Sequence, residues 1–523
     1  MDRSSWNRTS RRAFLAQVGG AMLTAGVGPQ LSSSLGVNLL WADEPAGRLT
    51  FGPLENLVGL MQDTPADQLL PHLAAQWKQG VDARTLLAAG ALANARTFGG
   101  EDYVGFHTFM ALVPAGEMSR VLSGPAAALP VFKVLYRNAS RIQAFGGQQA
   151  EVLHPVTPAE GTPSANALHE AARQPDVDAA ERQFAALVRE STSDAYNALQ
   201  GLIEDEEDVH RVVLSWRAWS TLDLTGAEHA HSLLRQSVRY CCQVEKRIKE
   251  RGNGQTSRIR TVLPALMDQY HLHDKAPGDK PVSDQWIADF AAICYGTDRD
   301  RAADAVAAAI ADGISLPAIG EALSVAATQL VLNDPGREER WATPEKPAGC
   351  VHGDSIGVHA SDAANAWRNI AAVCQPRQAI ASLIVAAHHT AGQSGKMPQD
   401  PFAASATDEG LARLDGGQLL QEVETAIRAN DQARAVAVVQ HLGERNLPAQ
   451  PLFDLLLQHS VAADGALHAE KYYQTVRESF ATTRPAYRWR HITALARVVA
   501  SEAGRPAPGL DQARELLAIR GQS

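Results

Sequence analysis

The stretch Cys350-Val-His-Gly-Asp-Ser-Ile-Gly-Val-His-Ala-Ser-Asp-Ala-Ala-Asn-Ala-Trp-Arg-Asn369 combines a helical pattern with an unusual density of polar side chains. From Ser355 onward it is rich in Ala, and its apolar residues recur at helical spacing. Four polar residues, spaced three, three and four apart, share one face of that helix: His359, Asp362, Asn365 and Asn369. Because such groups are costly on a buried helix unless something binds them, we interpret this face as part of a functional site.

The chain on either side of this stretch also reads as helix. Alternating apolar and polar runs are scarce, which argues against strands. Helix starts are frequent, as in Thr64-Pro65-Ala66-Asp67, where a capping Thr precedes Pro and an acid in the first turn. The sequence therefore predicts an all-α fold.

A His near the start of an apolar helix recurs along the chain. The intervals between these residues are 124, 128 and 109: His107, His231, His359 and His468. We interpret residues 43–523 as a single all-helical region of about four units, a helical-repeat or toroid-like array with quasi-repeats of roughly 110–130 residues. A closed array would bring the histidines together. Only the helix after His468 looks solvated, because Glu470 and Lys471 follow at once.

The N-terminal residues read as an export signal. A twin-arginine pair, Arg11-Arg12, precedes a weakly apolar run rich in Gly and Ala that ends near Trp41-Ala42. This order is typical of a Tat signal peptide over residues 1–42, read by the Tat export machinery, which moves folded proteins. We therefore expect a periplasmic or otherwise exported protein.

The net charge and the cysteine content limit which kinds of binding partner we expect. Loss of residues 1–42, with four basic residues and one acidic residue, changes the formal charge from −10 to −13. That sign argues against nucleic acid and anionic membranes as partners, and no second apolar stretch is long enough to span a bilayer. Five cysteines without a CxxC pair are expected to be core residues. A small-molecule substrate is the remaining expectation.

The polar residues of the His-bearing segments suit a metal site. Glu228 and His231, three residues apart, can share a helix face, and one of the adjacent pair His388-His389 can face the same site. The candidate metal ligands are His107, Glu228, His229, His231, His352, His359 and His388. The candidate catalytic residues are Asp354, Asp362 and Asn365. Imidazole with carboxylate suits a divalent transition metal, namely Fe, Zn, Mn or Cu.

Two other patterns compete with this site. Glu207 and His210 form a second E-x-x-H pair, as in di-metal carboxylate bundles, but Glu207 lies in the charged run Glu204–Asp208, which is typical of a solvated helix start. Gly353-Asp354-Ser355-Ile356-Gly357 matches the letters of a G-x-S-x-G nucleophile elbow, yet no strand precedes it.

The run Val358–Ile370, with its His followed by a short polar residue and then Ala-x-Arg spacing, resembles a helix of the questin oxidase-like family. The segments around His107 and His229-Ala-His231 are similar to other His-bearing helices of that family. The family's activity is a Baeyer–Villiger-type oxygenation of anthraquinones that is tied to reduced nicotinamide. This chain departs from it in its export signal and in Asp362, where we expect Thr. The resemblance implies a helical oxidoreductase with a His-lined pocket.

These observations lead to three hypotheses. The first is an exported metal-dependent oxidoreductase that acts on a small organic substrate. The second is a metal-dependent hydrolase, in which the metal lowers the pKa of bound water. The third is a non-catalytic helical-repeat binding scaffold whose histidines are structural.

Overall fold

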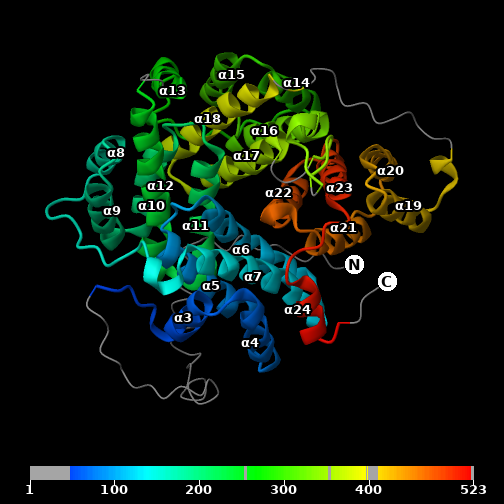
Figure 1. The fold of residues 1–523 in the computed structure, drawn as a ribbon. Coiled ribbons are helices and arrows are strands. Elements are labelled where there is room, and N and C mark those ends of the chain that lie inside the picture. Colours follow the sequence, from blue (N-terminus) through cyan, green and yellow to red (C-terminus); the bar gives the residue numbers. More distant parts are fainter. Residues whose placement is uncertain are drawn as a thin grey trace, which may run out of the picture. The chain divides into compact units, whose positions relative to one another are not determined.

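The structure, a computed structural model, describes residues 47–252, 256–344, 346–351, 355–395, 397 and 410–519. Within these ranges the regular structure is helical, and the few β-bridges, such as Gly278 with Ser315, are isolated. The predicted all-α fold is confirmed (Figure 1). Leu49–Ser523 is one compact unit.

The N-terminal part holds the α-helices and 3₁₀ helices (η) η1 (Gly52–Leu54), α3 (Glu55–Asp63), α4 (Ala66–Lys78), α5 (Ala83–Phe98), α6 (Tyr103–Val121), η2 (Gly124–Ala127), α7 (Ala128–Phe145) and η3 (Gly147–Ala150). The middle part holds α8 (Ala165–Arg173), α9 (Val177–Glu190), α10 (Thr192–Ile203), α11 (Val209–Thr225), η4 (Ala227–His229), α12 (Ala230–Glu250), α13 (Ile259–Gln269), α14 (Asp284–Tyr295), α15 (Arg299–Ala311), α16 (Leu316–Asn333) and η5 (Glu339–Trp341).

The C-terminal part holds α17 (Ile356–Val373), α18 (Pro376–Ser394), η6 (Leu411–Arg413), α19 (Gly416–Arg428), α20 (Gln432–Glu444), α21 (Gln450–Ala462), η7 (Gly465–Leu467), α22 (His468–Thr482), α23 (Trp489–Glu502) and α24 (Leu510–Leu516).

Short polar side chains start several of these helices. Asp102 caps α6 by accepting a hydrogen bond from Gly105 N, and Asp208 caps α11 by accepting from His210 N and Arg211 N. Ser355 caps α17 and accepts from Val358 N. The helix predicted from Ser355 onward is therefore confirmed, and its start is fixed by a side-chain cap.

Four helices from distant parts of the chain form the centre. In space α6 contacts α11, α11 contacts α17, α17 contacts α22, and α22 contacts α6, so the four make a closed cycle. Figure 1 shows them side by side, with the other helices of the compact unit around them. The wider four-unit repeat stays a prediction.

Close packing between α16 and α17 explains why a glycine stands at position 357. Gly357 lies in the first turn of α17, where a Cβ would come 2.7 Å from the Cα of Val331 in α16. A larger residue would therefore push α17 away from α16 and displace the residues that follow on its polar face.

Several buried charges of the compact unit are paired. Arg96 lies 2.7 Å from Glu55, Arg211 lies 2.9 Å from Glu245, and Lys133 lies 2.5 Å from Glu470. Such pairing is what a buried charge requires, because an isolated ion in a protein interior is very costly.

The predicted signal peptide, residues 1–42, lies outside the described residues. Across the residues that the structure describes, no helix has the length and apolar character needed to cross a bilayer.

Candidate metal centre

Each helix of the central cycle carries a histidine in or next to its first turn: His107 in α6, His210 in α11, His359 in α17 and His468 in α22. The predicted convergence of His107, His359 and His468 is therefore seen, and His210 takes the place expected for His231.

The four imidazole rings form a closed ring of neighbours. Ring centroids are 4.9 Å apart between His107 and His210, and 5.6 Å apart between His210 and His359. The cycle closes through His468, which lies 5.0 Å from His359 and 5.2 Å from His107. One ligand atom from each of His107, His210 and His359 lies within 4.8 Å of the other two.

The Nδ1 atoms face oxygens just upstream in the chain. His107 Nδ1 lies 2.6 Å from Tyr103 O, His359 Nδ1 lies 2.9 Å from Ser355 O, and His468 Nδ1 lies 3.3 Å from Gly465 O. His210 Nδ1 lies 3.6 Å from a carboxylate oxygen of Asp208. Because a carbonyl oxygen only accepts, the contacts of His107, His359 and His468 assign the proton to Nδ1 and leave the Nε2 lone pair for a ligand.

The Nε2 atoms of His107, His210 and His468 are buried and have no hydrogen-bond partner. Burial holds the pKa of His107 and of His468 far below the usual range, and the nearby Lys471 strengthens both effects. These two rings are therefore neutral, which is the form that binds metal.

The set of donors fits a transition-metal ion. Metal–imidazole bonds of about 2.0–2.1 Å place the ligands of a tetrahedral site roughly 3.4 Å apart. The ligand atoms of the three-histidine group lie within 4.8 Å of one another, so the rings would have to move closer together to hold an ion at that spacing. The carbonyl and carboxylate contacts at Nδ1 are the outer-shell partners that metal-bound histidines require.

A layer of charged residues lies one or two turns further along the same helix faces. Asp362 follows His359 by three residues, Lys471 follows His468 by three, and Arg217 follows His210 by seven. All three are buried. Asp362 accepts a hydrogen bond of 2.8 Å from Thr475 Oγ1, and burial raises its pKa. Burial lowers the pKa of Lys471 to about 8.

The end of the predicted polar face binds a neighbouring carboxylate. The side-chain amides of Asn365 and Asn369 each donate to Glu478 Oε2 of α22, both at 2.9 Å. Gln474 donates to the other oxygen at 2.7 Å. The predicted face of α17 thus meets one face of α22 along three turns, and Asn365 positions Glu478.

The segment that leads into His468 has an unusual backbone. Gly465, Ala466 and Leu467 all have positive φ, at 49°, 46° and 64°. Side-chain-bearing residues rarely adopt this region, and such conformations concentrate at functional sites. The side chain of Leu467 gives α22 no capping hydrogen bond.

A pocket of about 230 Å³ reaches the cluster from the side of α6 and α7. It is lined by Val104, His107, Thr108, Arg137, Ser140, Arg141, Ala144, Ala466 and Leu467. His107 is therefore the member of the cluster that a small molecule in this pocket would meet.

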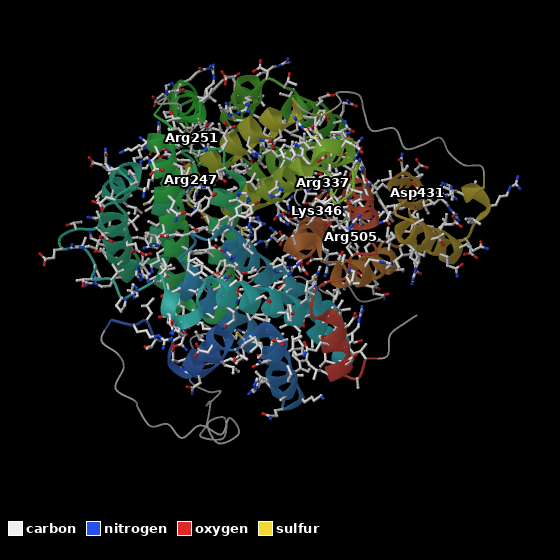
Figure 2. The ribbon with its side chains drawn as sticks, viewed as in Figure 1. Arg247, Arg251, Arg337, Lys346, Asp431 and Arg505 are labelled. Carbon is white, nitrogen blue, oxygen red and sulfur yellow. The ribbon has the colours of Figure 1, made fainter. Side chains whose placement is uncertain are left out.

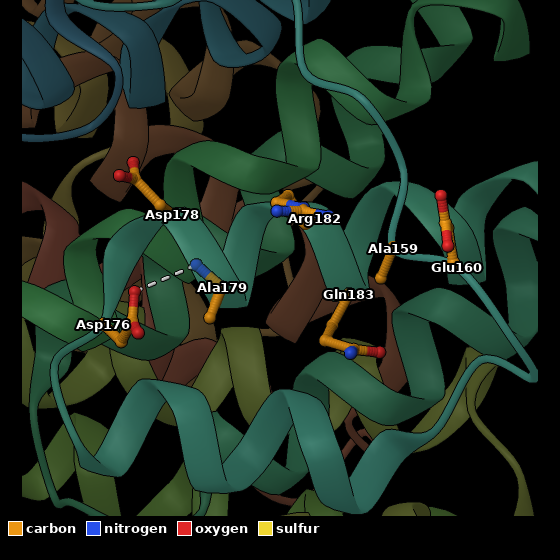
Figure 3. A pocket seen from close by; sticks show the side chains of 7 residues that line it. All are labelled: Ala159, Glu160, Asp176, Asp178, Ala179, Arg182 and Gln183. Atoms are coloured by element: carbon orange, nitrogen blue, oxygen red, sulfur yellow. Dashed lines mark hydrogen bonds between the residues drawn. The ribbon is translucent and has the colours of Figure 1, made fainter.

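Another surface pocket, of about 610 Å³, lies beside α9 and shares no residue with the cluster (Figure 3). Its Asp176 carboxylate caps α9 by accepting from Ala179 N at 3.0 Å, drawn as the dashed line. The acidic residues here belong to a solvated helix start, and we assign them no function.

The remaining candidate ligands lie elsewhere. His231 stacks on Phe184 of α9 with a centroid distance of 6.3 Å, His229 packs against Phe51, and Glu228 is exposed. His388 lies between Glu207 (2.5 Å) and Asp300 (3.2 Å), so both of its ring nitrogens have carboxylate partners. His352 and Asp354 lie outside the described residues.

Two members of the cluster were absent from the predicted ligand set, His210 and His468. The Glu207–His210 spacing had marked His210, but the preceding charged run suggested a solvated helix start. The expectation that the helix of His468 is solvated is wrong, because Glu470 is fully buried and Lys471 is 2% exposed. Glu470 is buried since Lys133, far upstream in the chain, neutralises it.

Comparison of the chain with protein-family models, curated proteins and solved structures gives no match.

Proposed function

We propose that this protein is an exported metalloprotein that binds a divalent transition-metal ion through His107, His210, His359 and His468 and acts as an oxidoreductase on a small organic substrate. The observation that carries the proposal is the closed ring of four imidazoles, in which Nδ1 of His107, His359 and His468 faces an upstream carbonyl oxygen. A purely structural histidine has no need of such convergence.

The donor set favours Fe, Cu, Zn or Mn, since imidazole suits these ions and, among the described residues, no carboxylate joins the three-histidine group. A bound ion would supply Lewis-acid or redox chemistry at the base of the 230 Å³ pocket. Asp362, whose pKa is raised by burial, and Lys471, whose pKa is lowered by burial, would exchange protons with the reacting molecule.

Export and reaction class rest on the sequence. The twin-arginine segment supports transport after folding, which fits a metal acquired in the cytoplasm. The likeness to questin oxidase-like helices supports an oxidoreductase. A metal-dependent hydrolase is the alternative, favoured by the His-only ligand set, which also occurs at catalytic zinc sites that activate water.

Metal analysis of protein purified after assembly in its native cytoplasm tests the proposal. We expect close to one transition-metal ion per chain, lost in His107→Gln and His210→Gln. The control His231→Gln, which changes a histidine outside the ring, should keep the metal. Circular dichroism checks that each variant is folded.

The identity of the ion then separates the functions. A redox-active metal with an optical band supports the oxidoreductase, and colourless zinc supports the hydrolase. Wild-type protein without stoichiometric metal would contradict both.

A further inference from the structure

Two cations of the charged layer have no direct partner. Lys471 is 2% exposed and Arg217 is 3% exposed, so neither is solvated as a surface residue is. Among the described residues, neither side chain makes an ion pair or a hydrogen bond, and Arg217 Nε is a buried donor left unmatched. Surface cations such as Arg247 of α12 and Arg251, which follows that helix, are exposed to water instead (Figure 2).

The nearby carboxylates make their direct contacts elsewhere. Asp362 is the first charge that acts on Lys471, but its carboxylate accepts a hydrogen bond from Thr475. The oxygens of Glu478 accept from the amides of Asn365, Asn369 and Gln474. Glu470 forms the ion pair with Lys133. Among the described residues, neither buried cation therefore has a carboxylate at ion-pair distance.

The helix geometry adds to the positive potential. The first turns of α6, α11, α17 and α22 all lie at the histidine ring, and a helix N-terminus carries a partial positive charge. Asp102, Asp208 and Ser355 cap three of these helices, whereas α22 has no side-chain cap. A divalent ion in the ring would raise the positive charge further, so an anion is the missing component.

We propose that Arg217 and Lys471 bind the carboxylate of a small organic acid and hold the acid against the histidine ring. Guanidinium and ammonium groups form their strongest hydrogen bonds with such oxyanions. The inference deepens the proposed function, on which it rests, because it makes the substrate an organic anion. The pocket at His107 is lined by the apolar Val104 and Ala144, which would contact the hydrocarbon part of such an acid.

Isothermal titration calorimetry on the purified protein, metal-loaded and metal-stripped, tests this inference. The probes are acetate and benzoate, their neutral amides, and inorganic phosphate. We expect saturable binding of a carboxylate and none of its amide. Lys471→Met and Arg217→Met should each weaken carboxylate binding about 10-fold to 100-fold. The controls Lys133→Met and Arg247→Met should leave it unchanged wherever they fold.

Arg217→Lys keeps the positive charge and replaces Arg217→Met in the titration if Arg217→Met does not fold. Arg217→Lys should also weaken carboxylate binding. Binding of inorganic phosphate in preference to every carboxylate would overturn the organic-acid assignment. Absence of carboxylate binding, or binding unaffected by the Lys471 and Arg217 variants, would overturn it as well. If carboxylate binding is absent but the wild-type protein still holds its metal, the proposed metal site stands and only this inference fails. Carboxylate binding by metal-stripped protein supports the inference on its own.

Discussion

Lys133 in α7 and Lys471 in α22 are both almost completely buried, yet their surroundings differ. The amino group of Lys133 lies 2.5 Å from Glu470 and donates to the carbonyl oxygens of Ser460 and Ala463. Lys471, the next residue after Glu470, has no such partner. Successive helical residues point in different directions, so α22 places a paired charge on one side and an unpaired charge on the side of the histidine ring.

The buried histidines likewise differ in whether their ring nitrogens have hydrogen-bond partners. His491 is satisfied at both ring nitrogens, 2.7 Å from Thr328 Oγ1 and 3.0 Å from Thr483 Oγ1. In the central ring, His107 and His468 have a partner at Nδ1 and none at Nε2. A fully satisfied buried polar group stabilises a fold, whereas a convergent set of unsatisfied groups indicates ligand binding.

The largest expected effect concerns the two lysines. Lys133→Met leaves Glu470 buried without a counter-charge and should lower the free energy of unfolding by about 3–5 kcal/mol. Lys471→Met removes an unpaired charge and should leave the stability of anion-free protein unchanged or higher. Urea unfolding of both variants measures this difference. Equal losses of unfolding free energy in the two variants would contradict the difference between Lys133 and Lys471. The double variant Lys133→Met with Glu470→Gln should recover part of the stability that Lys133→Met loses.

The second prediction concerns pH and two buried histidines outside the central ring. Burial lowers the pKa of His491 to about 3 and that of His389 to about 4. Below the unfolded value of about 6.5 the unfolded chain takes up a proton that the folded chain does not, so stability falls as the pH falls. Each residue should cost about 2 kcal/mol at pH 5 relative to pH 7.5.

Urea unfolding at both pH values checks this loss, and His491→Gln should make it smaller by about 2 kcal/mol. A variant with the full wild-type loss would show that His491 does not titrate on unfolding.

The smallest expected effect separates stability from ligand binding in a single residue. Ser355 caps α17 with its side chain and holds His359 Nδ1 with its carbonyl oxygen. Ser355→Ala removes only the cap and should lower the free energy of unfolding by about 1 kcal/mol. Because the carbonyl remains, we expect an unchanged metal content by elemental analysis. Loss of metal would mean that the cap itself positions the ring.

The polar face of α17 could be predicted because helical spacing and a capping Ser are local properties. His107 and His359 were predicted as partners for the same reason, since both follow a helix start. The choice of His231 over His210 failed because the run Glu204–Asp208 looked solvated. Its carboxylates instead pair with residues such as Arg377, Arg173 and His388. The burial of α22 depends on Lys133, and a contact across such a separation leaves no local pattern.

The closed cycle of helices has a consequence for the order of assembly. His107 and His468 are 361 residues apart in the chain, so their contact closes a very long loop. A nascent chain that lacks α22 has at most three of the four imidazoles, and the ring is complete only after the C-terminal helices dock. Metal capture is then a late event that reports completed folding, which would suit a protein that leaves its compartment only once folded.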